Sequence, residues 1–301
     1  MDIIFRQLFV LYFFLLIGWA FGKRRPDLQP QTGLLSFLLV NLFLPSKVFG
    51  AFARNFTLSF LRQHSTTVLV SLSLLAALIV ASFFVARLLA KDAQKQKLYR
   101  YSLTISNYAY VGYALAEGIF GPMALTNLIM FCFPFIVYAN GFGYVMFTGD
   151  RFAAKRLINP AVIAIVCGAV FGLCGWQVPS LLEPILSFLS DGMGPLSMMM
   201  TGIVLSGFSL RYLRGDGATY LAVFLRLLVI PAAILALFSL PCLQALRPTA
   251  VLMACMPCPI NPVLLARMTG RDCGDAVRLI LLSMAGAAAT LPFWLWVLMQ
   301  L

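Results

Sequence analysis

Long apolar stretches separated by short polar connections make up nearly all of this chain of 301 residues. Ten such stretches cover residues 3–22, 31–52, 66–90, 101–120, 123–147, 159–176, 185–210, 218–238, 247–270 and 275–299. A helix that crosses a bilayer needs about 20 mostly apolar residues, so each stretch is long enough to cross. The pattern predicts an all-α membrane protein with ten transmembrane helices and no separate soluble domain.

Two of these stretches contain residues that interrupt a transmembrane helix. The ninth contains Pro257, Pro259 and Pro262, and each proline removes a helix hydrogen bond. The fourth has a polar and aromatic middle, from Ser106 to Tyr113, where a lipid-facing helix is aliphatic. Irregular backbone at membrane depth is tolerated only where it is buried in protein or lines a cavity. We therefore expect two broken helices that cross near mid-membrane and point their half-helix N-termini at an anion.

Composition and charge agree with a membrane protein and indicate on which side of the membrane each connection lies. Hydrophobic residues make up 61% of the chain and charged residues 11%, whereas soluble domains carry about 25% charged residues. The net charge of +12 comes from Lys and Arg that lie mainly in alternate connections between the predicted spans. The positive-inside rule then predicts a multi-pass membrane protein of ten spans with both termini outside. Because the basic residues are explained by orientation, no nucleic-acid partner is expected.

The two halves of the chain are candidates for an inverted repeat. Five spans fall in residues 1–150 and five in 151–301, and an odd number of spans per half inserts the second half from the opposite face. A shift of 150 residues places Gly18 on Gly168 and the fourth span on the ninth. Such glycines equally suit close helix packing, so the match alone leaves both interpretations open.

Several loose motifs occur in a characteristic order along almost the whole chain. They comprise Ser106, Asn107, Tyr110 and Gly112 in the fourth span, Asn159 and Pro160 at the start of the sixth, Pro257, Asn261, Leu265, Ala266, Arg267, Gly270 and Asp275 in and after the ninth, and Leu291, Pro292 and Trp294 in the tenth. In this order they resemble the auxin efflux carrier family, which covers plant auxin carriers and bacterial permeases for malate, malonate and related carboxylates.

The resemblance implies a fold like that of sodium/bile-acid and sodium/proton carriers. Spans 1, 2, 6 and 7 would form a scaffold and a homodimer contact, and the other six spans would form a core that moves in elevator-type transport. Two positions depart from the family pattern: Ala109 stands where glycine is usual, and Tyr113 replaces the proline of the crossing. We therefore expect the break of the fourth span to depend on Gly112 and the tyrosines to narrow the pocket.

The candidate substrate-binding residues lie in the broken spans and in the eighth span. They are Asn107, Tyr108, Tyr110, Gly112, Tyr113, Pro257, Asn261, Pro262 and Arg226. Each of the two amides offers donors and an acceptor, for a ligand or for the broken backbone beside it. Arg226 is a charge inside a span, which marks a functional candidate. It can face a substrate carboxylate, reach the membrane interface, or bind carbonyls of a broken span.

Absent residue types narrow the chemistry. No Asp or Glu lies deep in a predicted span, which favours an anionic substrate over a cation. Cys255 and Cys258 sit inside an apolar span and His64 is the single histidine, so no metal site, cofactor or enzyme activity is predicted. Glu117 lies toward the outer end of its span. Three interpretations are open for it: a gate, a proton carrier, or a solvated carboxylate at a helix end.

These observations predict a secondary active transporter or uniporter for a small organic anion, a mono- or dicarboxylate. One alternative is a transport-inactive membrane sensor or interaction protein that keeps the fold and the pocket, which the unusual Tyr113 would suit. Another is a sodium-coupled symporter like the bile-acid carriers, although the spans provide no buried carboxylate to hold the ion. Membrane lipid and a second copy of the chain are the other expected partners.

Overall fold

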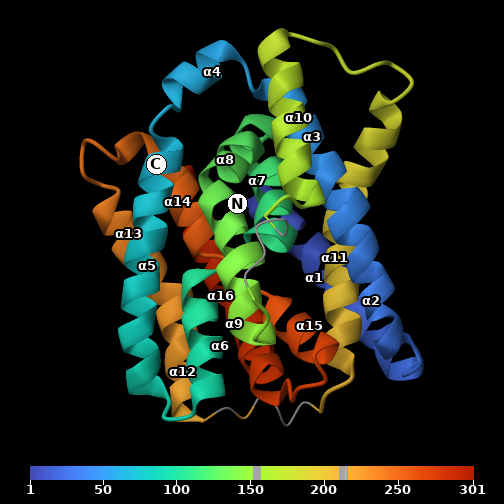
Figure 1. Ribbon diagram of the computed structural model, residues 1–301, viewed down its shortest axis with the longest axis vertical. Coiled ribbons are helices and arrows are strands. Elements are labelled where there is room, and N and C mark those ends of the chain that lie inside the picture. Colours follow the sequence, from blue (N-terminus) through green and yellow to red (C-terminus); the bar gives the residue numbers. More distant parts are fainter. Residues whose placement is uncertain (152–156, 210–213, 215) are drawn as a thin grey trace.

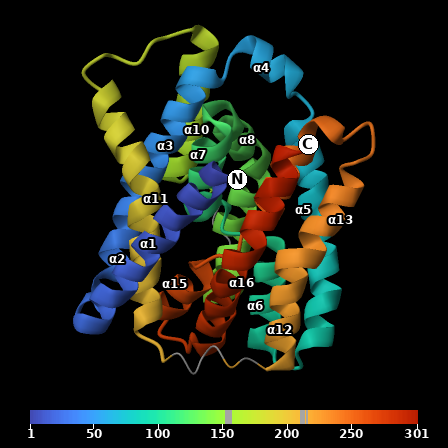
Figure 2. The ribbon, with the colours of Figure 1, turned by 180° about the vertical axis from the view of Figure 1, so that it is seen from behind.

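The computed structural model describes residues 1–151, 157–209, 214 and 216–301 (Figures 1 and 2). It is 81% helical, and the described residues contain no β-strand. In this described part of the chain, seven helices are long and apolar enough to cross a membrane, at Asp2–Arg24, Leu28–Asn55, Thr67–Leu89, Pro122–Thr148, Glu183–Ser206, Gly217–Leu237 and Gly274–Met299. A shorter apolar helix covers Pro160–Cys174. The prediction of an all-α membrane protein is confirmed.

The helices follow the apolar stretches of the sequence. In the first half they are α1 (Asp2–Arg24), α2 (Leu28–Leu38), α3 (Leu44–Asn55), α4 (Leu58–Gln63), α5 (Thr67–Leu89), α6 (Ala93–Thr104), α7 (Tyr113–Phe120), α8 (Pro122–Tyr138) and α9 (Tyr144–Thr148). In the second half they are α10 (Pro160–Cys174), α11 (Glu183–Ser206), α12 (Gly217–Phe224), α13 (Ile230–Leu237), α14 (Arg247–Ala254), α15 (Asn261–Met268) and α16 (Gly274–Met299).

The two predicted broken helices are broken in the structure. The fourth stretch divides into α6 and α7, which are separated by extended backbone at Ile105 and by a π-helical turn (Tyr108–Gly112). The ninth divides into α14 and α15, and the residues between Ala254 and Asn261 are not helical. The expectation that Gly112 makes the first break is wrong, because Gly112 is helical. It lies where a Cβ would come 3.3 Å from Cγ of Met256, so it permits close packing instead.

π-helical turns also occur where proline enters a long helix. Such turns precede Pro45 (Leu39–Phe43) and Pro231 (Leu225–Val229). Proline has no N–H, so the carbonyl four residues earlier loses its helix partner and the helix widens locally. At Pro231 the freed carbonyl belongs to Leu227, and the indole N–H of Trp294 donates to it over 2.8 Å.

Some predicted boundaries differ from the structure. The seventh span was predicted to extend to residue 210, but α11 ends at Ser206. Leu210 lies outside the described residues, as do Lys155, Arg156 and Arg211 of the predicted basic connections. The short helix α4 was not predicted; the hydroxyl of Thr57 caps it by accepting from the N–H of Phe60 over 3.2 Å.

Two close helix pairs hold one side of the molecule together. Helix α1 packs along α11, and α3 packs along α10. A Cβ at Gly18 would lie 2.1 Å from the carbonyl oxygen of Met199, and one at Gly168 would lie 2.8 Å from that of Phe49. Only glycine permits such approaches, so each of these glycines is required by a helix contact.

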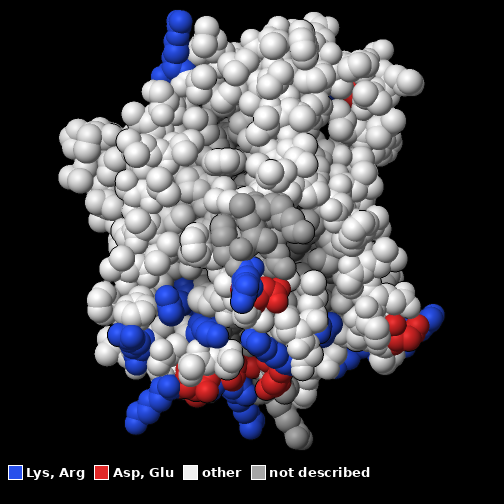
Figure 3. All heavy atoms as spheres, viewed as in Figure 1, with Lys and Arg blue, Asp and Glu red and all other residues white. Residues whose placement is uncertain are grey.

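Charge is distributed unevenly between the two ends of the molecule. Lys and Arg gather at the lower end of Figure 3, with few of them elsewhere on that face. Both chain ends are marked in the upper half of the same view in Figure 1. The termini therefore lie away from the basic end.

Candidate functional site

The two breaks touch each other in the interior. The backbone N–H of Asn107 donates to the carbonyl oxygen of Pro257 over 2.9 Å. The hydroxyl of Ser106 donates to the carbonyl of Met253 over 2.7 Å. Asn107 is 5% exposed and Ser106 is 2% exposed, so these bonds form away from the surface. The backbone that each break exposes is thus partly satisfied by the other break, as irregular backbone at membrane depth requires.

Arg226 binds the carbonyl groups where the first half of each broken helix ends. Its guanidinium donates to the carbonyls of Leu103, Ala254 and Met256 over 3.3, 3.0 and 3.2 Å. The residue is 1% exposed, and it begins from the π-helical turn between α12 and α13. The last carbonyls of a helix have no partner within the helix and carry partial negative charge. Of the three roles considered for Arg226, this arrangement corresponds to binding the carbonyls of the broken spans.

The second halves of the broken helices begin beside the contact between the breaks. Helix α15 starts at Asn261 and Pro262, and the π-helical turn leading into α7 starts at Tyr108. The first N–H groups of a helix lack acceptors within it and carry partial positive charge. With the carbonyl ends held by Arg226, the site presents the positive ends of two half-helices.

A small cavity lies next to these helix starts. Its volume is about 110 Å³, well below the roughly 300–1,000 Å³ of most ligand pockets. Its polar lining consists of Ser106, Asn107, Asn140, Asn159, Asn261 and the tyrosines Tyr108, Tyr110 and Tyr113. No Asp, Glu, Lys or Arg is among the described residues that line it. The cavity therefore combines amides and hydroxyls with mainly apolar walls, its described lining carries no charge, and its volume suits a small guest.

Two buried donors at this cavity have no hydrogen-bond partner among the described residues. They are the hydroxyl of Tyr113, whose residue is 1% exposed, and Nδ2 of Asn159. The other amide atom of Asn159, Oδ1, accepts from the N–H of Val162 over 3.0 Å and so caps α10. Leaving a buried polar group unsatisfied costs about 1–3 kcal/mol. Both residues belong to the lining of the cavity, and both of these atoms are themselves buried.

The structure brings together five of the predicted site residues: Asn107, Tyr108, Tyr110, Tyr113 and Asn261 all line the cavity. The amide of Asn261 also donates to the hydroxyl of Tyr101 over 3.2 Å. Pro257 contributes its carbonyl to the contact between the breaks, and Gly112 packs behind it against Met256. Arg226 and Pro262 do not line the cavity.

Sequence reasoning missed two amides of this lining, Asn140 and Asn159. Asn140 was detectable as a polar residue within an apolar stretch, and its Nδ2 donates to the carbonyl of Ile136 over 2.9 Å. Asn159 had been interpreted only as the opening of a helix. Its place at the cavity depends on where α10 starts in the fold, and the local sequence does not contain that information.

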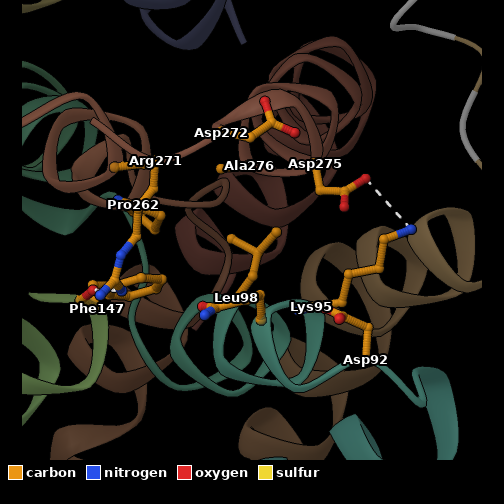
Figure 4. A pocket seen from close by; sticks show the side chains of 11 residues that line it. Asp92, Lys95, Leu98, Phe147, Pro262, Arg271, Asp272, Asp275 and Ala276 are labelled. Carbon is orange, nitrogen blue, oxygen red and sulfur yellow. Dashed lines mark hydrogen bonds and ion pairs between the residues drawn. The ribbon is translucent and has the colours of Figure 1, made fainter. Parts of the chain in front are cut away.

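A larger hollow lies at the basic end, with a volume of about 530 Å³ (Figure 4). Pro262 lines this hollow, and the preceding residue, Asn261, lines the small cavity. The hollow and the cavity are therefore lined by neighbouring residues at the start of α15. Lys95 forms ion pairs with Asp275 at 3.4 Å and Asp216 at 3.2 Å. Hydrogen bonds from Thr219 lower the pKa of Asp216 to about 2, and Lys95 contributes to this shift.

Outside the lining of the cavity, Glu117 forms an ion pair with the buried Lys47. Nζ of Lys47 on α3 donates to the Glu117 carboxylate on α7 and lies 3.4 Å from the carbonyl oxygen of Ser190 on α11. The lysine side chain is 4% exposed and that of the glutamate 32%. The carboxylate is thus engaged in a partly buried ion pair between three helices.

The described residues provide no other recognisable reaction centre. They contain no group of three His, Cys, Asp or Glu side chains that could hold a metal ion. Cys255 and Cys258 are buried free thiols, as expected for residues that fill space in a helix break.

Comparison with known proteins agrees with this geometry. The family model described as membrane transport protein matches residues 3–149 and 144–295. The chain is also 24% identical over 292 residues to an uncharacterized transporter of Methanocaldococcus jannaschii, and the alignment covers 90% of this chain and 91% of that protein. With its apolar helices, the chain is a multi-pass membrane protein. It belongs to the membrane transport protein family, the auxin efflux carrier family.

Proposed function

We propose that the protein is a secondary active transporter or uniporter for a small organic anion, a mono- or dicarboxylate. The observation that supports this most is the cavity beside the contact between Asn107 and Pro257. Its polar lining consists of amides and hydroxyls, and two of these residues have buried donors without a partner among the described residues. The guanidinium of Arg226 binds carbonyls of both breaks that meet beside the cavity. A carboxylate provides the acceptors and the negative charge that such a site lacks.

In this proposal the amides and the tyrosine hydroxyl hold the carboxylate. Asn107 and Asn261 come from the two broken helices, Tyr113 from α7 and Asn159 from the start of α10. Tyr108 and Tyr110 form walls that keep the cavity small. The hollow at the basic end, which reaches Pro262, would be the route between the cavity and that side of the membrane.

The proposed architecture has ten spans in two inverted repeats of five, residues 1–150 and 151–301. Its support is the arrangement of the two close helix pairs. Gly18 lies in the first span and packs on the seventh, whereas Gly168 lies in the sixth and packs on the second. An inverted repeat that relates span 1 to span 6 and span 2 to span 7 exchanges these two contacts.

The same two helix pairs suggest which helices stay fixed during transport and which move. We propose that α1, α2, α3, α10 and α11 form the scaffold and the homodimer contact, and that the remaining helices move against it as the core of an elevator. Both termini would lie on the outer side of the bacterial inner membrane, because the basic end would face the cytoplasm. Arg226 would act as a structural charge that holds the two breaks together.

Uptake by proteoliposomes tests this function. The purified protein is reconstituted and offered labelled short mono- and dicarboxylates, with protein-free liposomes as control. We expect uptake of at least one carboxylate, competition by unlabelled carboxylates, and no competition by the corresponding neutral amides. Binding without uptake would indicate the transport-inactive sensor, and uptake that requires sodium would indicate the sodium-coupled symporter. Absence of both binding and uptake across the panel would contradict an organic-anion carrier.

A further inference from the structure

A wide apolar groove runs along the outside of the molecule, away from the cavity. It lies between α5 and the α8–α9 segment and has a volume of about 590 Å³. Its walls include Leu75 and Ile79 of α5, Val137 of α8 and Met146 of α9. Leu72 also lines it and is 51% exposed, so the groove opens onto the surface that faces lipid. Arg100 of α6 is the one charged residue among the described residues of its lining.

Two arginines share one aromatic ring at this place. Cζ of Arg87 lies 4.0 Å and Cζ of Arg100 lies 4.8 Å from the ring centroid of Phe83. Within the described residues, neither guanidinium forms an ion pair with a carboxylate or a side-chain hydrogen bond. Arg87 lies two residues before the end of α5 at Leu89. In Figure 1 this helix runs from beside α4 at the top toward the lower end, where Lys and Arg gather in the same view in Figure 3. Two like charges therefore stand close together without an anion.

Two guanidiniums that lie over the same ring repel each other, and among the described residues neither has a carboxylate partner to offset this repulsion. A phosphate group would neutralise both, because a guanidinium donates two parallel hydrogen bonds to phosphate oxygens. The groove beside them is lined mainly by apolar side chains, with Arg100 and Tyr138 as the polar residues of its described lining, so it suits a hydrocarbon chain. We propose that this groove binds an anionic glycerophospholipid of the leaflet at the basic end, with its phosphate at Arg87 and Arg100 and an acyl chain along α5 and α8.

Native mass spectrometry of the full protein in detergent tests the site with two lipids of equal chain length. Phosphatidylglycerol should remain bound, whereas phosphatidylcholine should be lost at the same collision energy. The variant Arg87→Gln/Arg100→Gln should bind phosphatidylglycerol about a hundredfold more weakly, since losing a hydrogen bond to a charged group costs roughly tenfold for each arginine. The matched control Arg24→Gln/Arg214→Gln removes two exposed arginines elsewhere and should bind as the wild type does.

A second variant separates a shaped groove from diffuse attraction to positive charge. Val137→Trp fills the groove and leaves both arginines in place, so it should reduce phosphatidylglycerol binding by about tenfold, as expected when apolar contact of an acyl chain is lost. Leu88→Trp is the control, because Leu88 is 88% exposed on the same helix α5 and does not line the groove. Equal retention of the two lipids, or unchanged binding in either groove variant, would overturn the proposal.

Discussion

The N–H of Asn107 and the carbonyl oxygen of Pro257 lie 2.9 Å apart, and this hydrogen bond joins the breaks of two helices that are 150 residues apart in sequence. The bond explains why irregular backbone is stable here: each break supplies a group that the other lacks. It also fixes the starts of both second half-helices at one cavity. The two amides of Asn107 and Asn261 then face the same small volume.

The amides at the cavity should be required for transport. Asn107→Ala or Asn261→Ala removes the amide that one broken helix contributes to the cavity, and we expect uptake of the carboxylate to fall at least about tenfold, the effect of losing one hydrogen bond to a charged group. Membrane insertion and the gel-filtration profile should be unchanged. Asn41→Ala is the matched control, because Asn41 is an exposed amide that donates to its own helix at Phe37. Wild-type uptake by both cavity variants would remove these residues from the mechanism.

Replacing Arg226 should lower the stability of the protein more than it changes the affinity for substrate. Arg226→Met leaves the carbonyls of Leu103, Ala254 and Met256 without their donor, and each unsatisfied group costs about 1–3 kcal/mol. We expect a large fall in the melting temperature in detergent, and partial recovery in Arg226→Lys. In the lysine variant the KM for the carboxylate should be close to that of the wild type. An unchanged melting temperature in Arg226→Met would contradict the structural role.

The interaction between Lys47 and Glu117 should contribute to the stability of the fold, so losing one partner should cost more than losing both. Glu117→Gln leaves a lysine that is 4% exposed without its counter-ion. Because Glu117 is 32% exposed, we expect a loss of about 2 kcal/mol, below the 3–5 kcal/mol found when fully buried pairs are broken. The double variant Lys47→Met/Glu117→Gln should recover most of this loss. A double-mutant cycle on unfolding in detergent measures the coupling, and additive effects would contradict it.

Asp216 should make stability depend on pH in the acid range. Its carboxylate caps α12 by accepting from the N–H and the hydroxyl of Thr219, and its pKa falls from 3.8 to about 2. Because the folded pKa is the lower one, the stabilisation is fully present above about pH 4 and is lost as the pH falls from about 4 to about 2. Asp216→Ala should cost about 1 kcal/mol at neutral pH.

Thermal unfolding of the wild type and Asp216→Ala, compared from neutral pH down to about pH 3, checks this expectation. The difference between their melting temperatures should shrink as the pH falls, because the wild type loses the charged cap. A difference that stays constant, or that grows toward acid pH, would show that the cap does not depend on ionisation of Asp216.

Local chemistry in the sequence was enough to predict that the fourth and ninth stretches break. Prolines 257, 259 and 262 cannot complete a helix, and the polar run from Ser106 to Tyr113 does not suit lipid. The position of the first break was not predictable in the same way. It falls before Tyr108 because the N–H of Asn107 bonds to Pro257, and that partner lies far away in the chain.

Arg226 and Asn159 show the same limit for the site. The sequence placed a charge within a span and left three roles open for it, because the position of its partners depends on how three separate segments pack. Asn159 has a local role as a helix cap that its sequence position explains completely. The residue lines the cavity only because α10 begins beside the two breaks.

The central claim is that a small carboxylate binds in the cavity where the two breaks meet. Ala109 lines this cavity, so Ala109→Cys can report on it once the exposed and half-buried thiols of Cys167, Cys174, Cys242 and Cys273 have been replaced. The rate of maleimide labelling is measured with and without the transported carboxylate, and Arg62→Cys on α4 is the control. We predict that the carboxylate slows labelling at position 109 while its neutral amide analogue does not, and that position 62 is unaffected by both. Equal labelling rates at position 109 with and without a saturating carboxylate would contradict the assignment.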